Sequence, residues 1–476
     1  MAFLIRLKGL GSQSLWLDEV MTVQDAMHPF VQIHRQILAS PPIFHYVVRL
    51  FYLFFGKDDF WLRFPAAVFG TLTIPIFYMG LKHFAGLRTA VWGALLLALS
   101  PIHIAYSQEL RMYSLGALEV LAAIFYFERA LESNAARHWA GVVAANLLGL
   151  YTHNWILFFT LSQVIGYALI GIQKRSRRPI GWLAFLMIGL FYLPWIPWLH
   201  AQAQRPVFSH LFRPSFSDFR DTFSALLSLN LSVGDCTLLT VPWVRVAYST
   251  LGLVGMTAGL WVPGRGRDVL NRMFLLGCVL PLLMAFVTSL FIKPIYMPSR
   301  YPVMALPCFL IPLVRCVAMN DNRILRRLGC AMGLMWIIGW SMTLGLYYGQ
   351  FAKGGWKFAA HWIAIHAYAG DGIWPAPLGF SDIALRYYLP GEIVPLTDPL
   401  SGRSKHLFIP YFNLGDSESS MPLGPRMSRK WSIADKYRWG GISVLLLNSK
   451  AVASNQGSLG PARTRARGVR GPAIGR

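Results

Sequence analysis

Apolar runs of roughly 20 residues recur between about residue 63 and residue 348. This is the length that an α-helix needs to cross the ~30 Å hydrocarbon core of a membrane. Charged residues make up only 14% of the chain and hydrophobic residues 55%, whereas a soluble globular protein carries about 25% charged residues. The sequence therefore predicts an all-α polytopic membrane protein, with about ten to twelve transmembrane helices. It excludes a secreted disulfide scaffold, a disordered chain and a cytosolic enzyme.

The predicted spans alternate with two kinds of connection. We place the spans at about 63–83, 89–105, 110–130, 137–153, 155–172, 180–199, 244–262, 270–291, 301–318 and 328–348. Every second connection is rich in Lys and Arg, namely Lys82, Arg88, Arg129, Arg137, Lys174, Arg175, Arg177, Arg178, Arg265, Arg267, Arg272, Arg315, Arg323, Arg326 and Arg327. Such loops stay in the cytoplasm. The alternate connections, the long first loop at 11–62 and everything after residue 348 are then expected outside.

The regions outside the spans have their own patterns. Residues 1–10 resemble the last turns of a transmembrane helix, either one that begins upstream or an interfacial segment. The apolar run from Pro42 to Phe55 is too short to span and reads as interfacial or re-entrant. Residues 1–348 thus form a transmembrane domain. For 349–450 we predict a small extracytoplasmic α/β domain, with a helix in WKFAAHWIAIHAYAG and strands in HLFIPYF and ISVLLLN. Residues 451–476 form a basic tail without apolar periodicity, which predicts disorder.

The net charge of +23 and the five cysteines both have simple explanations in a membrane protein. Basic residues gather in the expected cytoplasmic loops, so no nucleic-acid partner is implied. An odd number of cysteines argues against a disulfide framework, and the sequence contains no Cys-x-x-Cys spacing for a metal. We expect neither a metal site nor a cofactor.

Acidic residues at the outer membrane boundary are the informative exceptions in so apolar a chain. The first cluster is Asp18 and Glu19, in SLWLDEVMTV. Asp18 can cap the following helix, or it can act as a general base at the membrane surface. The second cluster, SPIHIAYSQELRMYSL, contains Glu109, Arg111 and Tyr113. Glu109 can complement a helix N-terminus, or it can share a polar site with Asp18.

Basic residues also occur on the expected outer side. Lys293 and Arg300 lie in FIKPIYMPSRYPVMALP, against the cytoplasmic bias of the other loops. Both could contact a lipid headgroup, or they could hold the phosphate of a substrate, which Arg binds with two hydrogen bonds. In YTHNW, His153 is typical of a polar residue in an interfacial belt. Tyr113 and His153 are candidates for substrate binding.

Several segments, in this order, resemble glycosyltransferase family 39 and its bacterial relatives, which are GT-C fold enzymes. They are SLWLDE, SPPIFHYVVRLFYLFFG, WLRFPAAVFGTLTIPIFYMGLKHFAG, ALLLALSPIHIAYSQELRMYSL, LYTHNW, SRYPVMALP, GGWKFAAHWIAIHAYAGDGIW and ALRYYLP. The resemblance covers roughly residues 11–390. The chain departs from the family at Ser40, where many relatives have His before the double proline, and in its nearly absent first span and its basic C-terminal tail.

The resemblance implies an integral membrane enzyme that takes a sugar from a polyprenyl-phosphate donor on the outer side and transfers it, with inversion, to a glycolipid, polysaccharide or protein. In that family the acidic pair of the first loop supplies the base, which maps to Asp18 with Glu19 beside it. The acidic residue of the second outer loop maps to Glu109. Binding of the donor phosphate maps to Arg111 and Arg300, with Lys293 nearby.

Two alternatives remain open at this point. A transporter or lipid flippase would place ionisable groups near the middle of the membrane, and Glu119, deep in the predicted span 110–130, is such a group. A non-catalytic membrane anchor for the outer domain would leave Asp18 and Glu109 as helix caps.

Overall fold

The fold is that of a computed structural model, and it divides the chain into two compact units. The first unit runs from Met1 to Lys357 and the second begins at Phe358. The structure describes residues 1–36, 40–173, 179–204, 213–227, 230–233, 236–239, 242–298, 300–318, 323–349, 353, 355–368, 371–374, 381–389, 406–412, 425–439 and 442–450. The predicted tail 451–476 and the basic loop at 174–178 lie outside these residues.

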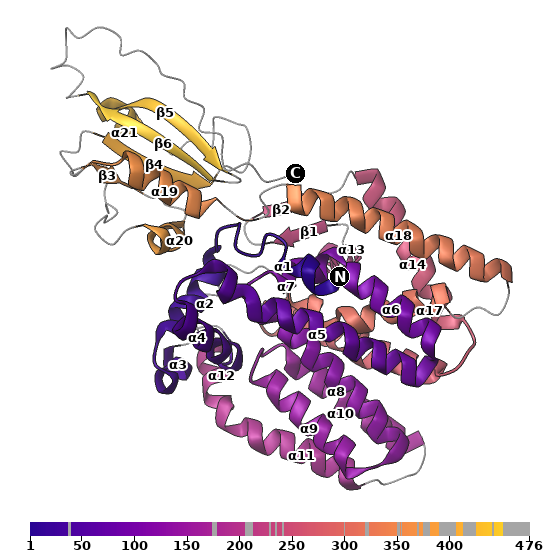
Figure 1. The fold of residues 1–476 in the computed structure, drawn as a ribbon. Helices are drawn as coiled ribbons and strands as arrows, with labels where there is room; N and C mark the ends of the chain where they lie inside the picture. The colour runs from indigo at the N-terminus through magenta and orange to yellow at the C-terminus, as the bar shows by residue number, and fades with distance from the viewer. Residues whose placement is uncertain are drawn as a thin grey trace. The chain divides into compact units, whose positions relative to one another are not determined.

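The first unit is built almost entirely of helices (Figure 1). Four helices precede the first long one: α1 (Ala2–Leu7), α2 (Leu17–Met27), α3 (Phe30–Gln36) and α4 (Ile43–Phe55). The bundle continues with α5 (Asp59–Ala85), α6 (Leu87–Leu99), α7 (Pro101–Ser107), α8 (Tyr113–Ser133), α9 (Ala136–Leu150), α10 (Ile156–Gln173), α11 (Pro179–Tyr192), η1 (Leu193–Trp195) and α12 (Ile196–Ala203). After α13 (Phe216–Leu226) and a hairpin of β1 (Asn230–Val233) and β2 (Cys236–Leu239) come α14 (Pro242–Trp261), α15 (Arg267–Phe274), η3 (Leu275–Val279), α16 (Leu280–Phe291), η4 (Tyr301–Ala305), α17 (Leu306–Ala318) and α18 (Arg323–Gly349).

Helices occupy all ten positions at which the apolar runs predict membrane spans. Six helical segments among the described residues are long and apolar enough to cross a membrane: Asp59–Ala85, Ile156–Gln173, Pro179–Ala203, Arg267–Phe291, Tyr301–Ala318 and Arg326–Gly349. A seventh is added if α6 and α7 count as one span. The prediction of an all-α polytopic membrane protein is confirmed. The short apolar run after Pro42 forms α4, a helix of 13 residues.

The span predicted at 89–105 is not one straight helix. α6 ends at Leu99, α7 begins at Pro101, and their axes differ by 59°. Proline has no backbone N–H to donate and disfavours a helical conformation in the residue before it, and Ser100 is accordingly extended, with ψ 118°. The next helix then begins at Tyr113 rather than at residue 110. Residues 108–112 therefore form a turn between α7 and α8.

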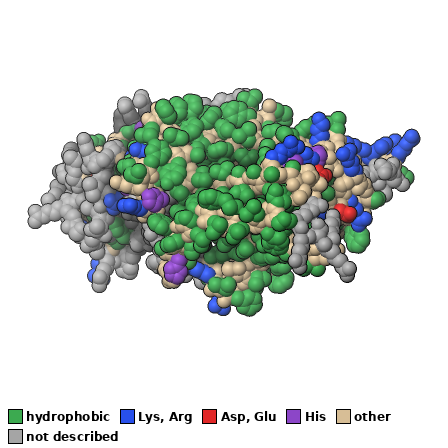
Figure 2. Space-filling view, turned by 90° about the horizontal axis from the view of Figure 1, so that it is seen from below, with side chains coloured by type: hydrophobic (Ala, Val, Ile, Leu, Met, Phe, Trp, Pro, Cys, Tyr) green, Lys and Arg blue, Asp and Glu red, His purple; other side chains and the backbone are tan. Residues whose placement is uncertain are grey.

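The surface of the molecule has the distribution of side chains that a membrane protein needs. Figure 2 shows one face on which hydrophobic side chains cover the middle and Lys and Arg gather towards the edges. Large apolar side chains on α10 and α11 are exposed, including Leu169, Ile172, Leu183 and Leu186. In water such a surface would be costly, so the exposed helix faces are suited to contact with lipid.

Helix α5 joins two chemically different ends of the bundle. Near its start, Arg63 forms an ion pair with Glu19. Near its end, His83 contacts Glu132 with Nε2 2.9 Å from Oε2, and its carbonyl accepts a hydrogen bond from Arg265. The 20 residues that separate Arg63 from His83 correspond to about 30 Å of helix, the thickness of the hydrocarbon core. The carboxylate cluster around Glu19 and the basic connections thus lie at opposite ends of this helix.

The second unit contains a four-stranded sheet. Its elements are α19 (Trp356–His366, which begins just before the boundary), β3 (Gly372–Ile373), α20 (Ser381–Tyr388), β4 (His406–Phe412), α21 (Pro425–Lys430), β5 (Trp431–Trp439) and β6 (Ile442–Ser449). The strand order is β3-β4-β6-β5, with β3 parallel to β4 and the other pairs antiparallel. Leu407 and Ile409 of β4 and Leu445 and Leu447 of β6 form its core. The predicted helix and both predicted strands are present.

Candidate active site

A buried carboxylate at the start of α2 organises the site. Glu19 is fully buried, and its Oε2 accepts a hydrogen bond from the backbone N–H of Trp16 at 3.2 Å. This contact satisfies one of the free amide groups at the helix N-terminus. Its Oε1 accepts a second backbone hydrogen bond, from Leu110 at 2.7 Å. Glu19 therefore ties the first turn of α2 to the turn between α7 and α8.

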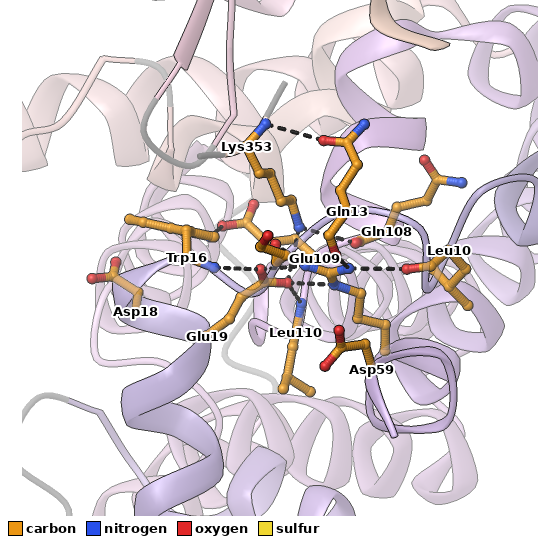
Figure 3. A network of polar contacts seen from close by, with 12 residues as sticks. Leu10, Gln13, Trp16, Asp18, Glu19, Asp59, Gln108, Glu109, Leu110 and Lys353 are labelled. Carbon is orange, nitrogen blue, oxygen red and sulfur yellow. Dashed lines mark hydrogen bonds and ion pairs between the residues drawn. The ribbon is translucent and has the colours of Figure 1, made fainter. Parts of the chain in front are cut away.

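Two cations complete the surroundings of Glu19 (Figure 3). Arg63 of α5 donates from Nε to Oε1 at 2.8 Å and from Nη2 to Oε2 at 2.7 Å. Lys353, in the segment after α18, donates from Nζ to Oε1 at 2.9 Å. Arg63 also donates to the carbonyls of Leu10, Gln13 and Ser14. Four segments that are distant in the sequence are thus held at one point.

The ionisation of Glu19 follows from these contacts. Burial alone would raise its pKa, but the charges of Arg63 and Lys353 and the hydrogen bonds from Arg63 and Leu110 lower the pKa of Glu19 to about 2. The carboxylate stays ionised at neutral pH and accepts five hydrogen bonds. Such a group is suited to holding the site together rather than to exchanging protons.

Glu109 is the second buried carboxylate and has a different environment. Its Oε1 accepts a hydrogen bond from the indole Nε1–H of Trp16 at 2.8 Å, whereas its Oε2 has no partner among the described residues. Burial raises the pKa of Glu109 to about 7, and the negative charge of Glu19 adds to this effect, although Lys353 and Arg300 oppose it. Glu109 is therefore able to change protonation state near neutral pH.

Asp18 is the accessible carboxylate of the three. Its Oδ2 lies 3.1 Å from Nη1 of Arg300, and both side chains are 25% exposed. The guanidinium of Arg300 also lies over the ring of Trp16, with Cζ 4.6 Å from the ring centroid. Arg111 approaches from the other side of the first turn, donating to the carbonyl of Asp18 at 3.2 Å and to Oγ1 of Thr22 at 2.8 Å. An acid and two cations thus meet at the partly open edge of the buried cluster.

The remaining candidates separate into two groups. Tyr113 and His153 lie beside each other, with ring centroids 6.0 Å apart, and both pack against Tyr301, the residue after Arg300. Lys293 is placed elsewhere in its loop, where its amino group donates to the carbonyl of Ala203 at the end of α12. The structure therefore gathers Asp18, Glu19, Glu109, Arg111 and Arg300 around Trp16, with the two rings nearby. It anchors Lys293 to a different element.

Sequence reasoning missed the two cations that pair with Glu19. Arg63 lies at the start of a predicted span, and an arginine there is a signal for a buried ion pair, although nothing in the sequence names its partner. Lys353 follows the last span and has no local pattern that marks it.

The described part of the chain contains no cluster of three or more His, Cys, Asp or Glu side chains that could hold a metal ion. The arrangement can nevertheless support acid–base and anion chemistry, because a carboxylate and two guanidinium groups meet at an accessible edge.

Residues 39–198 match the model of a family described as dolichyl-phosphate-mannose-protein mannosyltransferase. The crystal structure of ArnT from Cupriavidus metallidurans bound to undecaprenyl phosphate is similar over 97% of this chain and 98% of that chain, with a TM-score of 0.57 and 14% identity. The apo structure of ArnT is similar over the same shares, with a TM-score of 0.58 and 14% identity. No curated protein sequence matches the chain.

The chain has the GT-C fold of membrane glycosyltransferases. The family match confirms the resemblance to glycosyltransferase family 39 for residues 39–198, and the solved structures confirm the fold. The matched segment 39–198 contains Arg63, Glu109 and Arg111, and the acidic pair of α2 lies before it.

The raised pKa of Glu109 predicts a pH-dependent stability. Between the ordinary value of 4.5 and about 7, Glu109 keeps a proton in the folded chain that it has lost in the unfolded chain, so the contribution of Glu109 to stability falls as the pH rises from 5 to 8. Through Glu109, the wild type should lose on the order of 3 kcal/mol of its free energy of unfolding over this interval. Glu109→Gln cannot ionise, so it should not show this loss. The measurement is thermal unfolding of the purified protein in detergent at each pH. The lowered pKa of Glu19 affects stability only below pH 4.5, outside the interval.

The matched control is Asp221→Asn, which neutralises an exposed carboxylate on α13. It should leave the pH dependence as in the wild type. An equal pH dependence in the wild type and in Glu109→Gln would contradict the buried, proton-binding state of Glu109.

Proposed function

We propose that this chain transfers a sugar from a polyprenyl-phosphate donor to an acceptor hydroxyl or phosphate on a glycolipid, polysaccharide or protein, with inversion at the anomeric carbon. The observation that carries the proposal is the ion pair of Asp18 and Arg300 at the accessible edge of the site. It joins a proton acceptor to a phosphate-binding cation, the two functions that such a transfer needs. The fold of ArnT, whose structure holds undecaprenyl phosphate, supports the lipid-phosphate donor.

Asp18 is the best candidate for the base. Glu19 accepts hydrogen bonds from two cations and two backbone amides and is fully buried, so it has no free position for a substrate proton. Glu109 is 1% exposed and its Oε1 accepts a hydrogen bond from Trp16. Asp18 is 25% exposed, and its contact with Arg300 engages only Oδ2. Of these three carboxylates, Asp18 is the most accessible to an incoming acceptor.

The proposed step exchanges one bond at the anomeric carbon and moves one proton. The acceptor oxygen attacks the anomeric carbon as its proton passes to a carboxylate oxygen of Asp18. The bond between that carbon and the phosphate oxygen breaks, and the electron pair leaves with the polyprenyl phosphate. Direct displacement on the face opposite the leaving group inverts the anomeric centre. No nucleotide is required, because the donor already carries a phosphate leaving group.

The cations stabilise the charge that the leaving phosphate gains. Arg300 is suited to this role, because a guanidinium can donate two parallel hydrogen bonds to a phosphate and because its side chain is partly exposed. Arg111 holds the first turn of α2 through the carbonyl of Asp18 and Thr22 and adds positive charge. A fixed cation aimed at developing negative charge is the principal source of catalysis in such sites.

The two ends of α5 support the proposed sidedness. The basic connections around His83 and Arg265 lie at one end of α5 and the site lies at the other, about 30 Å away along the helix. Basic loops stay in the cytoplasm, so the site faces the extracytoplasmic side of the plasma membrane, in a bacterium the inner membrane. Lys353 contacts Glu19, so the chain leaves the bundle at the site end. We accordingly place the domain 349–450 outside as well.

Replacing Asp18 tests the base. Asp18→Asn keeps the size of the side chain and its ability to contact Arg300 but cannot accept the proton, so transfer should fall by about 10²- to 10⁴-fold. The measurement is the conversion of a panel of polyprenyl-phosphate sugars by purified protein, followed by mass spectrometry. Asp221→Asn is the matched control and should retain full activity. Undiminished transfer by Asp18→Asn would eliminate Asp18 as the base.

Replacing Arg300 tests the phosphate contact. Arg300→Ala removes charge-assisted hydrogen bonds, so KM for the lipid-linked donor should rise about ten- to one hundred-fold, and more than KM for the acceptor. Arg220→Ala, which removes a 76% exposed guanidinium from α13, serves as the control. The role is disproved if the apparent affinity for the donor is the same in Arg300→Ala and in the wild type.

A further inference from the structure

Trp16 lies between the buried carboxylate cluster and the accessible cation. It precedes α2, its side chain is 3% exposed, and two charged side chains contact it at different places. Glu109 contacts the edge of the ring and Arg300 lies over its face. Trp16 is therefore the one residue among these contacts that links Glu109 to Arg300.

The contact at the edge fixes the orientation of the ring. The indole Nε1–H donates to Oε1 of Glu109 at 2.8 Å, while the backbone N–H of Trp16 donates to Oε2 of Glu19 at 3.2 Å. Both ends of the residue are thus held by carboxylates, and Figure 3 shows Trp16 at the margin of this cluster with its contacts to it as dashed lines. A tryptophan held at its backbone and at its indole nitrogen has little freedom to rotate.

The contact at the face fixes the cation. Cζ of Arg300 lies 4.6 Å from the centroid of the Trp16 ring, within the range of a cation–π interaction, for which tryptophan is the strongest partner. A carboxylate at the ring edge adds attraction for the cation. Contact with a ring face leaves the N–H groups of a guanidinium available, because these lie in the guanidinium plane. The ring can therefore hold Arg300 without occupying the donors that a phosphate needs.

We infer that Trp16 is a positioning residue that orients Arg300 to bind the donor phosphate. The inference rests on the proposed function of Arg300. Trp16 and Asp18 restrain Arg300 from two sides, so that its guanidinium is in place before the donor arrives. A preorganised cation costs less to order on binding than a free arginine side chain.

The test is a double-mutant cycle on lipid binding. Undecaprenyl phosphate is titrated against the purified full chain in detergent for the wild type, Trp16→Leu, Arg300→Ala and the double variant. Trp16→Leu should weaken binding about three- to thirty-fold, but it should have no further effect in the Arg300→Ala background. Trp16→Phe keeps an aromatic face, so it should restore part of the affinity lost in Trp16→Leu. In transfer assays, Trp16→Leu should raise KM for the donor more than it lowers kcat.

The control is Trp139→Phe. Trp139 is 2% exposed and its indole donates to Oδ1 of Asn134 at 3.3 Å, so this variant loses an indole hydrogen bond away from the site. It should leave the affinity for the lipid unchanged. If Trp16→Leu does not fold, Trp16→Phe carries the same cycle, with an expected loss of about two- to five-fold that vanishes in the Arg300→Ala background.

The outcomes separate the inference from the proposed function. Unchanged binding in Trp16→Leu, or an equal loss with and without Arg300, overturns the positioning role while leaving the role of Arg300 intact. Unchanged binding in Arg300→Ala overturns the proposed phosphate contact itself, and the inference falls with it.

Discussion

The site depends on the buried ion pair between Glu19 and Arg63, with Lys353 as a second cation. The three side chains are 0%, 1% and 3% exposed. Removing such charges from water is costly, and the cost is offset only when geometry and hydrogen bonding are complete. Here Arg63 donates two hydrogen bonds to Glu19 and three to the backbone between Leu10 and Ser14. The pair therefore specifies how α2, α5 and the N-terminal segment meet.

The buried position of Glu19 also determines where the side chain of Asp18 lies. Consecutive residues of a helix point in directions about 100° apart, so a buried Glu19 leaves Asp18 at the edge of the cluster, beside Arg300. The two acidic residues therefore differ in role: Glu19 holds the structure together, and Asp18 remains accessible. Glu109 extends the cluster through Trp16 and so connects the buried charges to the cation at the edge.

The sequence allowed the helices to be predicted because the length of an apolar run is set by the membrane and not by tertiary contacts. The break at Ser100 was missed, although Pro101 signals it, because the apolar run continues through it. Asp18, Glu109 and Arg300 were singled out because charged groups stand out at a membrane boundary, and the structure brings them together around Trp16. The partner of Arg63 could not be predicted. The charges of the loops indicate on which side of the membrane a residue lies, but they do not indicate which helices pack against each other. Strand β5 was missed because Asp435 and Lys436 interrupt its apolar pattern.

The most direct measurement of the organising role of this ion pair is a stability cycle on Glu19 and Arg63. Glu19→Gln, Arg63→Met and the double variant are compared with the wild type by unfolding in detergent. Each single change strands a buried charge and should cost about 3–5 kcal/mol, whereas the double change should cost far less than the sum. Losses that simply add would show that the two residues act independently, and the account of the site would be wrong.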